Sequence, residues 1–189
     1  MRRGVLQTLT AAAVSATVFA GCQVESPTAG IPDQAPASLT QPETAQAAEA
    51  AGASTDLATL RRVTAPYHSF EQAQADGYTA KVTDCMSSPE GGMGFHYGDP
   101  ALINGTVEVA APEVLLYEPQ KNGELRLVGV EYVVPFDAWS ASEPPVLFGQ
   151  HFHRNETFGL WALHVWAWRH NPSGLFADWN PNVSCTEAS

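Results

Sequence analysis

The N-terminal part of this 189-residue chain is unsuited to a packed core. It starts with two arginines, runs through an uncharged apolar stretch and ends in small residues before Cys22, which is the layout of a secretory signal. The next segment is rich in Ala, Pro, Thr and Gln and contains no aromatic residue, so it buries too little apolar surface to order itself. We therefore expect a signal peptide over residues 1–21, a flexible tether over 22–55 and one domain over 56–189.

The segment Val18–Cys22 resembles the lipobox of bacterial lipoproteins, although Phe19 stands where leucine is usual. In such proteins the cysteine is acylated and becomes the mature N-terminus. The resemblance implies a lipid anchor on Cys22, attachment to a membrane through that anchor, and a place in the cell envelope. Gln23 follows the cysteine instead of Asp, which implies the outer membrane, on its periplasmic side. The alternative is an ordinary secretory signal with an incidental cysteine.

Charge argues against one class of partner. The chain carries 9 Lys and Arg against 20 Asp and Glu, a formal charge of −11, which repels phosphate backbones. We therefore expect no nucleic-acid partner. Charged residues make up 15% of the chain and hydrophobic residues 44%, a composition that fits a folded domain.

Two cysteines remain if Cys22 carries lipid. Thiols in exported proteins tend to oxidise, so we predict a disulfide between Cys85 and Cys185 that closes a loop of about 100 residues. The alternative is a cysteine pair in a metal site, but the chain has no CxxC spacing to favour it.

Local patterns predict helices first and strands afterwards. Ser69 begins a capping box, Gly77 would end the helix that follows it, and Asn122-Gly123 is a hairpin signal. A glycine-rich loop over 89–94 can make room for a close backbone approach. Helices followed by strands predict an α+β fold with an antiparallel sheet. The expected helices cover 56–63 and 69–76, and the expected strands cover 107–109, 114–117, 124–134, 146–153 and 160–169, the last with a helix as the alternative.

Several strings together resemble an uncharacterised family of exported bacterial proteins. The matching segment runs from about residue 57 to residue 185, and the resemblance implies that this segment is one domain. The strings are Gly92–Tyr97 (GMGFHY), Leu115–Pro119 (LLYEP), Leu127–Val134 (LVGVEYVV), His164–Arg169 (HVWAWR) and Trp179–Cys185 (WNPNVSC).

All six histidines fall in the expected domain, and two of them join an acid in the main site hypothesis. On the strand over 124–134, alternation puts Glu131 on one face with Leu125, Leu127 and Val133. A carboxylate among core residues must be protonated, paired or bound to a cation. His164 alternates with Trp166 and Trp168. Together with His96 these residues would form a two-histidine, one-carboxylate site, which suits a divalent transition metal such as iron, zinc, copper or manganese.

Structural roles are the alternative for each of these side chains. Glu131 would instead pair with Arg169 or accept hydrogen bonds from Tyr97 or Tyr132. His96 and His164 would be core imidazoles. The second-tier ligand candidates are His151 and His153, which share a face if 146–153 is one strand, and His68 at the start of a helix.

The sequence thus predicts an envelope lipoprotein that binds a metal ion or a small ligand in a pocket of histidine, glutamate and aromatic side chains. The chain has neither a GxSxG nor an HExxH motif, and no residue is assigned a catalytic role. Two alternatives stay open: a structural or interaction module of the envelope, and a small metal-dependent enzyme.

Overall fold

A computed structural model describes residues 41–188. The expected signal peptide and Cys22 lie outside these residues. The helical elements are α1 (Gln41–Thr64), η1 (Ala65–His68), α2 (Phe70–Ala75) and η2 (Phe136–Ala138). The strands are β1 (Ala80–Ser88), β2 (Gly91–Gly98), β3 (Val114–Pro119), β4 (Leu125–Pro135), β5 (Val146–Leu147), β6 (Gln150–His151), β7 (His153–Asn155) and β8 (Leu160–Val165).

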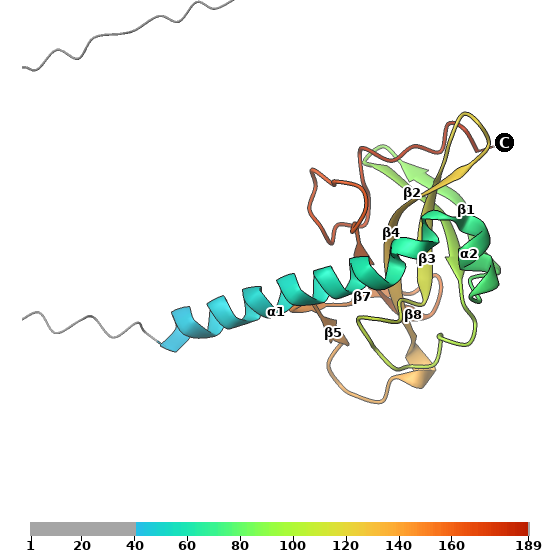
Figure 1. Cartoon of the computed structure of the whole chain (residues 1–189). Helices are drawn as coiled ribbons and strands as arrows, with labels where there is room; N and C mark the ends of the chain where they lie inside the picture. The colour runs from blue at the N-terminus through green and yellow to red at the C-terminus, as the bar shows by residue number, and fades with distance from the viewer. Residues whose placement is uncertain (1–40, 189) are drawn as a thin grey trace, which may run out of the picture. The chain divides into compact units, whose positions relative to one another are not determined.

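Six strands form one antiparallel sheet in the order β1-β2-β3-β4-β8-β7, and β5 pairs with β6 separately. The first four strands are consecutive hairpins, and β8 then adds to the free edge of β4. Helix α1 and the short helices η1 and α2 precede the sheet in the chain and pack against it (Figure 1). The predicted α+β fold with an antiparallel sheet is confirmed.

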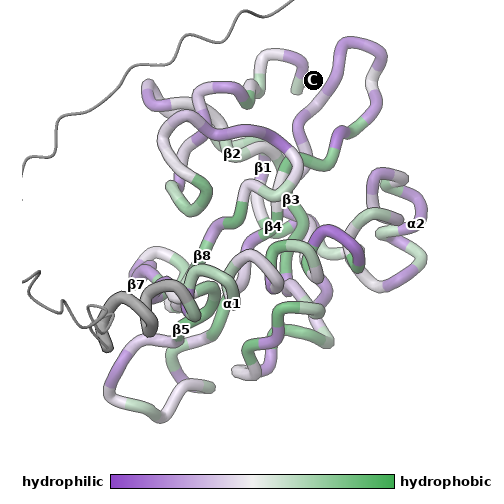
Figure 2. The backbone as a smooth tube through the Cα atoms, turned by 60° about the vertical axis from the view of Figure 1, so that its left-hand side comes forward, coloured by the Kyte–Doolittle hydropathy of each residue, from purple (hydrophilic) through white to green (hydrophobic). Residues whose placement is uncertain are grey.

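The sheet has two differently covered faces. One face packs against the helices, and this main core includes Leu60 of α1 and Ala73 of α2 with Tyr117 and Tyr132 of the central strands. The other face carries a smaller apolar cluster with no helical member: Val114, Leu116, Val128, Val133, Trp166 and Val183. Figure 2 shows hydrophobic stretches where β3 and β4 cross the middle of the domain, with a hydrophilic turn between them.

Helix α1 begins earlier than the sequence predicted. We expected a helix from Asp56, but α1 starts at Gln41, so the expected tether over 22–55 is helical from that residue on. The segment is rich in alanine, the residue with the highest intrinsic helix propensity. Its first half projects from the domain, and only towards Leu60 does it bury side chains (Figure 1). The lack of an apolar face in this segment therefore did not exclude a helix.

The second predicted helix is confirmed with its cap. The Ser69 side chain accepts a hydrogen bond from the backbone N–H of Gln72 at 3.2 Å. The helix ends at Ala75, and Gly77 follows with a φ of 116°. The capping-box prediction is half right, because the Gln72 side chain donates to Asp76 instead of returning to Ser69.

Several predicted strand boundaries were wrong. Residues 107–109 form no strand, although Val107 and Val109 pack against the main core and Val109 O accepts a hydrogen bond from the Tyr132 hydroxyl at 2.7 Å. The expected strand over 146–153 is divided among β5, β6 and the start of β7, and β8 ends at Val165. Apolar and β-branched residues at these positions therefore did not predict which of them join the backbone ladder.

The strands β1 and β2 were not predicted, because their sequences are polar or glycine-rich. They form a hairpin whose turn falls at Pro89 and Glu90. Gly94 within β2 has a φ of 86°, and a Cβ there would collide with the carbonyl of Tyr117 on β3. Only glycine fits this close approach. The backbone kink lies two residues before His96 and so helps to set that side chain's position.

The C-terminal segment is fastened back onto this hairpin. Asn180 forms an isolated β-bridge with Gly92, with N···O distances of 3.1 Å in both directions. A few residues later Cys185 forms the predicted disulfide with Cys85 of β1, which confirms the pairing. The glycine-rich loop was expected to permit a close backbone approach, and Gly92 provides it.

Candidate metal centre

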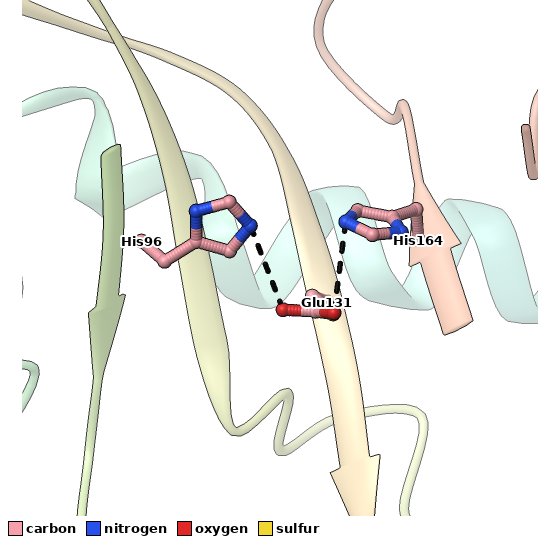
Figure 3. A group of neighbouring side chains, drawn as sticks. All are labelled: His96, Glu131 and His164. Atoms are coloured by element: carbon pink, nitrogen blue, oxygen red, sulfur yellow. Dashed lines mark ion pairs between the residues drawn. The ribbon is translucent and has the colours of Figure 1, made fainter. Parts of the chain in front are cut away.

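Three titratable side chains meet on the sheet face that the helices leave uncovered. His96 comes from β2, Glu131 from β4 and His164 from β8 (Figure 3). All three are buried, with exposed fractions of 3%, 9% and 5%. One ligand atom from each lies within 4.8 Å of the others. The sequence hypothesis that these three side chains face a common point is therefore confirmed.

The distances around the carboxylate are longer than hydrogen bonds. Glu131 Oε2 lies 3.7 Å from His96 Nε2, and Glu131 Oε1 lies 3.6 Å from His164 Nε2. Bonds of about 2.0–2.2 Å from a tetrahedral metal ion place neighbouring ligand atoms roughly 3.3 Å apart. The two carboxylate–imidazole distances are therefore only slightly longer than those between neighbouring ligands of a bound ion.

A β-bulge decides which face Glu131 occupies. Leu116 pairs with Gly129, but the next residue, Tyr117, pairs with Leu127, so Val128 is an extra residue on β4. Leu127 therefore faces the main core, whereas Glu131 lies on the opposite face with Val133. Our expectation that Glu131 shares a face with Leu125 and Leu127 was wrong, because strict alternation does not hold across a bulge.

Each imidazole turns its Nδ1 atom towards an oxygen of a second side chain. Thr83 Oγ1 on β1 lies 2.8 Å from His96 Nδ1. Asp178 Oδ1, in the C-terminal segment, lies 3.4 Å from His164 Nδ1. Both Nε2 atoms therefore point at Glu131 while both Nδ1 atoms face another oxygen. Metal-binding histidines are usually oriented in this way by an outer partner.

His164 is a buried imidazole whose ring nitrogens make no hydrogen bond within the described part of the chain. Neither ring nitrogen has a hydrogen-bond partner among the described residues, because the Asp178 oxygen is near Nδ1 but not aligned for a hydrogen bond. The ring lies nearly parallel to Trp166, with an interplanar angle of 10° and centroids 6.2 Å apart. An unmet polar atom at this depth is costly, so the environment favours a ligand on Nε2.

Electrostatics distinguish the two histidines. Burial lowers the pKa of His96, which favours the neutral ring that binds metals. Burial also acts to lower the pKa of His164, but the carboxylates of Glu131 and Asp178 outweigh it and raise the pKa above its ordinary value. The contact between Asp178 and His164 in turn lowers the pKa of the Asp178 carboxyl. A cation is therefore favoured at the His164 end of the site, whether a proton or a metal ion.

The structural alternatives for Glu131 are not realised. Arg169 Nε donates to the backbone oxygen of Asn182, and the Tyr132 hydroxyl donates to Val109 O. Tyr97 packs edge-to-face against Phe70 on the helix-covered side of the sheet. The neighbours that remain for the carboxylate are the two imidazoles.

The second-tier candidates lie apart from this cluster. His151 is exposed on β6, and His153 is exposed on β7, so the two do not share one strand face. His68, in η1, is exposed and packs edge-to-face on Trp168. His153 does approach the site indirectly, since its Nδ1 lies 3.4 Å from the same Asp178 oxygen that faces His164. None of the three is a direct ligand in this arrangement.

A small cavity adjoins the cluster. Its volume is about 100 Å³, and its polar lining includes His96, Glu131 and His164. The remaining walls are mainly apolar and include Met86, Met93, Ile103, Val114, Val133 and Leu160. The candidate ligands therefore face a space that is largely hydrophobic.

Sequence reasoning missed both outer partners. Thr83 and Asp178 lie in segments with no motif, and each reaches its histidine through pairing that the sequence did not reveal. Asp178 comes just before the Asn180 bridge to Gly92, which holds that segment beside the sheet. The glycine-rich loop was the only local signal of that contact.

No match to this chain was found among protein-family models, curated proteins or solved structures. The predicted family resemblance therefore stays a prediction. Within residues 41–188, none of the helices has the length and apolar character needed to cross a bilayer.

Proposed function

We propose that this protein binds a divalent transition metal ion through His96, Glu131 and His164. One observation carries the proposal: two buried imidazoles from different strands turn Nε2 towards a single carboxylate while their Nδ1 atoms face outer partners. Two histidines and one carboxylate suit iron, zinc, copper or manganese. The net charge of −11 also favours cation capture.

We further propose that the protein acts in the bacterial cell envelope, anchored through a lipidated Cys22. The signal layout of the first 21 residues and the lipobox-like segment support this placement. The Cys85–Cys185 disulfide is consistent with it, because such bonds persist in oxidising compartments. Mass spectrometry of the purified mature protein tests the anchor, and a chain starting at Cys22 without added acyl mass would contradict it.

Metal analysis of the full chain, purified without chelator, tests the first proposal. We expect one equivalent of metal per chain, or uptake of one equivalent when iron, zinc, copper or manganese is supplied. Substitution His164→Ala should abolish this uptake, and His96→Ala should do the same. Protein that neither retains nor takes up any of the four metals would contradict the proposal.

The chain offers a matched control for the histidine variants. His151→Ala removes an exposed imidazole that lies outside the cluster. The His151→Ala variant should bind metal with unchanged stoichiometry and affinity. If it loses metal to the same extent as His164→Ala, the metal binds to surface imidazoles. Circular dichroism should show the same sheet content in all variants, so that loss of metal reports on the site and not on folding.

A further inference from the structure

The cavity beside the cluster has the wrong chemistry for an anionic or strongly polar ligand. Among the described residues that line it there is no lysine or arginine. The polar lining apart from the three candidate ligands consists of Thr83, which already contacts His96, and Asn155 at the end of β7. A carboxylate or phosphate entering this space would meet the Glu131 carboxylate and find no lysine or arginine to pair with.

The size of the cavity limits its occupant to a few heavy atoms. The volume is about 100 Å³, less than the roughly 150 Å³ of an apolar cavity that takes up benzene or xenon. Apolar cavities of similar size stay dry and take up gases or small apolar molecules. The space beside the ligand atoms is therefore suited to a very small, weakly polar guest.

The rim of the same cavity is also apolar. Val82 of β1 is 44% exposed, and Phe158, in the β7–β8 turn, is 48% exposed. Three large hydrophobic side chains are exposed in the described part of the chain, and two of them, Val82 and Phe158, line this cavity. The exposed rim and the interior of the cavity thus both favour an uncharged molecule.

We infer that the site admits a neutral diatomic molecule, of the class of dioxygen and nitric oxide, past Val82 and Phe158 to an open coordination position of the bound metal. This inference rests on the proposed metal site. Three protein ligands leave at least one position of a transition-metal ion free, and a two-histidine, one-carboxylate set is the arrangement used for iron that binds such molecules. The same cavity is lined by all three candidate ligands.

The first test does not need metal. Crystals of the chelator-treated full chain, pressurised with xenon, should show xenon in the cavity between Met93 and His164. The variant Val82→Trp places a large side chain on the exposed rim, where added volume is tolerated, and should reduce xenon occupancy strongly. An unfilled cavity in the unsubstituted protein would overturn the inference.

The second test uses the iron(II)-loaded chain under anaerobic conditions with nitric oxide as the probe. We expect the half-integer-spin resonance of an iron–nitrosyl adduct, and prior addition of azide, which is an anion, should not diminish that resonance. Val82→Trp should slow formation of the adduct about tenfold, equivalent to about 1.4 kcal/mol in the barrier. Val146→Trp, a matched substitution at an exposed valine that does not line the cavity, should leave the rate unchanged.

The two proposals fail in different ways. If one equivalent of iron binds but nitric oxide gives no adduct, or azide binds in its place, the inference about the neutral ligand is wrong and the metal site stands. If no metal binds at all, the proposed function is wrong, and the diatomic-ligand inference falls with it even where xenon occupies the cavity.

Discussion

Glu131 lies directly opposite His164 in the β4–β8 ladder, and its Oε1 atom is 3.6 Å from the imidazole Nε2. The backbone hydrogen bonds of the sheet therefore hold two candidate ligands in register without the help of a metal ion. His96 reaches the same point from β2, across the intervening strand β3. Preorganised ligands of this kind reduce the entropy lost on binding, so we expect affinity to depend sharply on each side chain.

Glu131→Gln keeps the size of the side chain and removes its charge. We expect metal affinity to fall by at least about a hundredfold, since changes to outer-shell partners alone cost 10–100-fold. Isothermal titration with the metal found in the purified protein measures this change. Glu90→Gln, at an exposed carboxylate in the β1–β2 turn, is the control and should bind normally. Equal affinity in both variants would remove Glu131 from the site.

Asp178→Asn tests the outer partner of His164. The substitution removes the carboxylate 3.4 Å from Nδ1, so the ring is less firmly oriented and less basic. We expect metal affinity to fall by about 10–100-fold with unchanged stoichiometry. Asp137→Asn, at an exposed residue of η2, should have no effect. If affinity is unchanged in Asp178→Asn, the contact with His164 has no role in binding.

Glu113 gives a pH dependence of stability. Burial raises its pKa to about 8, helped by the nearby acids Glu131 and Glu108, while the backbone N–H of Val133 acts in the opposite direction. The folded state therefore keeps the proton that the unfolded state loses near pH 4.3. Stability is fully present below that pH and decreases as pH rises through about 8, by an amount on the order of 5 kcal/mol.

Urea unfolding of the metal-free chain across this pH range measures the effect. Glu113→Gln keeps an acceptor for the Val133 N–H and does not titrate, so its stability should change much less between acid and alkaline pH. A parallel decline of variant and unsubstituted protein would show that another group is responsible.

Loss of the disulfide should destabilise the domain and weaken metal binding together. The Cys85–Cys185 bond closes a loop with a sequence separation of 100, for which chain entropy predicts about 4–5 kcal/mol. The double variant Cys85→Ser, Cys185→Ser should unfold at lower denaturant concentration. It should also bind metal more weakly, because the segment that carries Asp178 is then held by fewer contacts. If the folded double variant binds metal with unchanged affinity, the disulfide does not contribute to metal binding.

The sequence predicted which side chains come together better than it predicted the structure that supports them. Asn122-Gly123 marked the β3–β4 hairpin, and His96, Glu131 and His164 were singled out because titratable residues inside apolar strands are rare. Their convergence is confirmed, whereas their role as metal ligands stays a prediction. The face assigned to Leu127 was wrong, since a bulge at Val128 has no signal in apolar alternation.

Long-range pairing explains the other misses. The hairpin of β1 and β2 is built from polar and glycine residues, so its strands form through contacts with β3 and the C-terminal segment and not through local preference. Thr83 and Asp178 were missed for the same reason. The first helix was predicted to be too short, because we interpreted an alanine-rich segment with no apolar face as a tether. The helix propensity of that segment alone favoured a helix.

The way the C-terminal segment closes over the β1–β2 hairpin has a consequence for biogenesis. His164 and Asp178 follow the β3–β4 hairpin in the chain, and Cys185, which fastens the segment that carries Asp178, follows both. A nascent chain that ends after the β3–β4 hairpin holds His96 and Glu131 but lacks His164. The proposed metal site is therefore complete only after the C-terminal segment has been synthesised and has folded back, and a chain truncated before Asp178 should bind metal more weakly than the full chain.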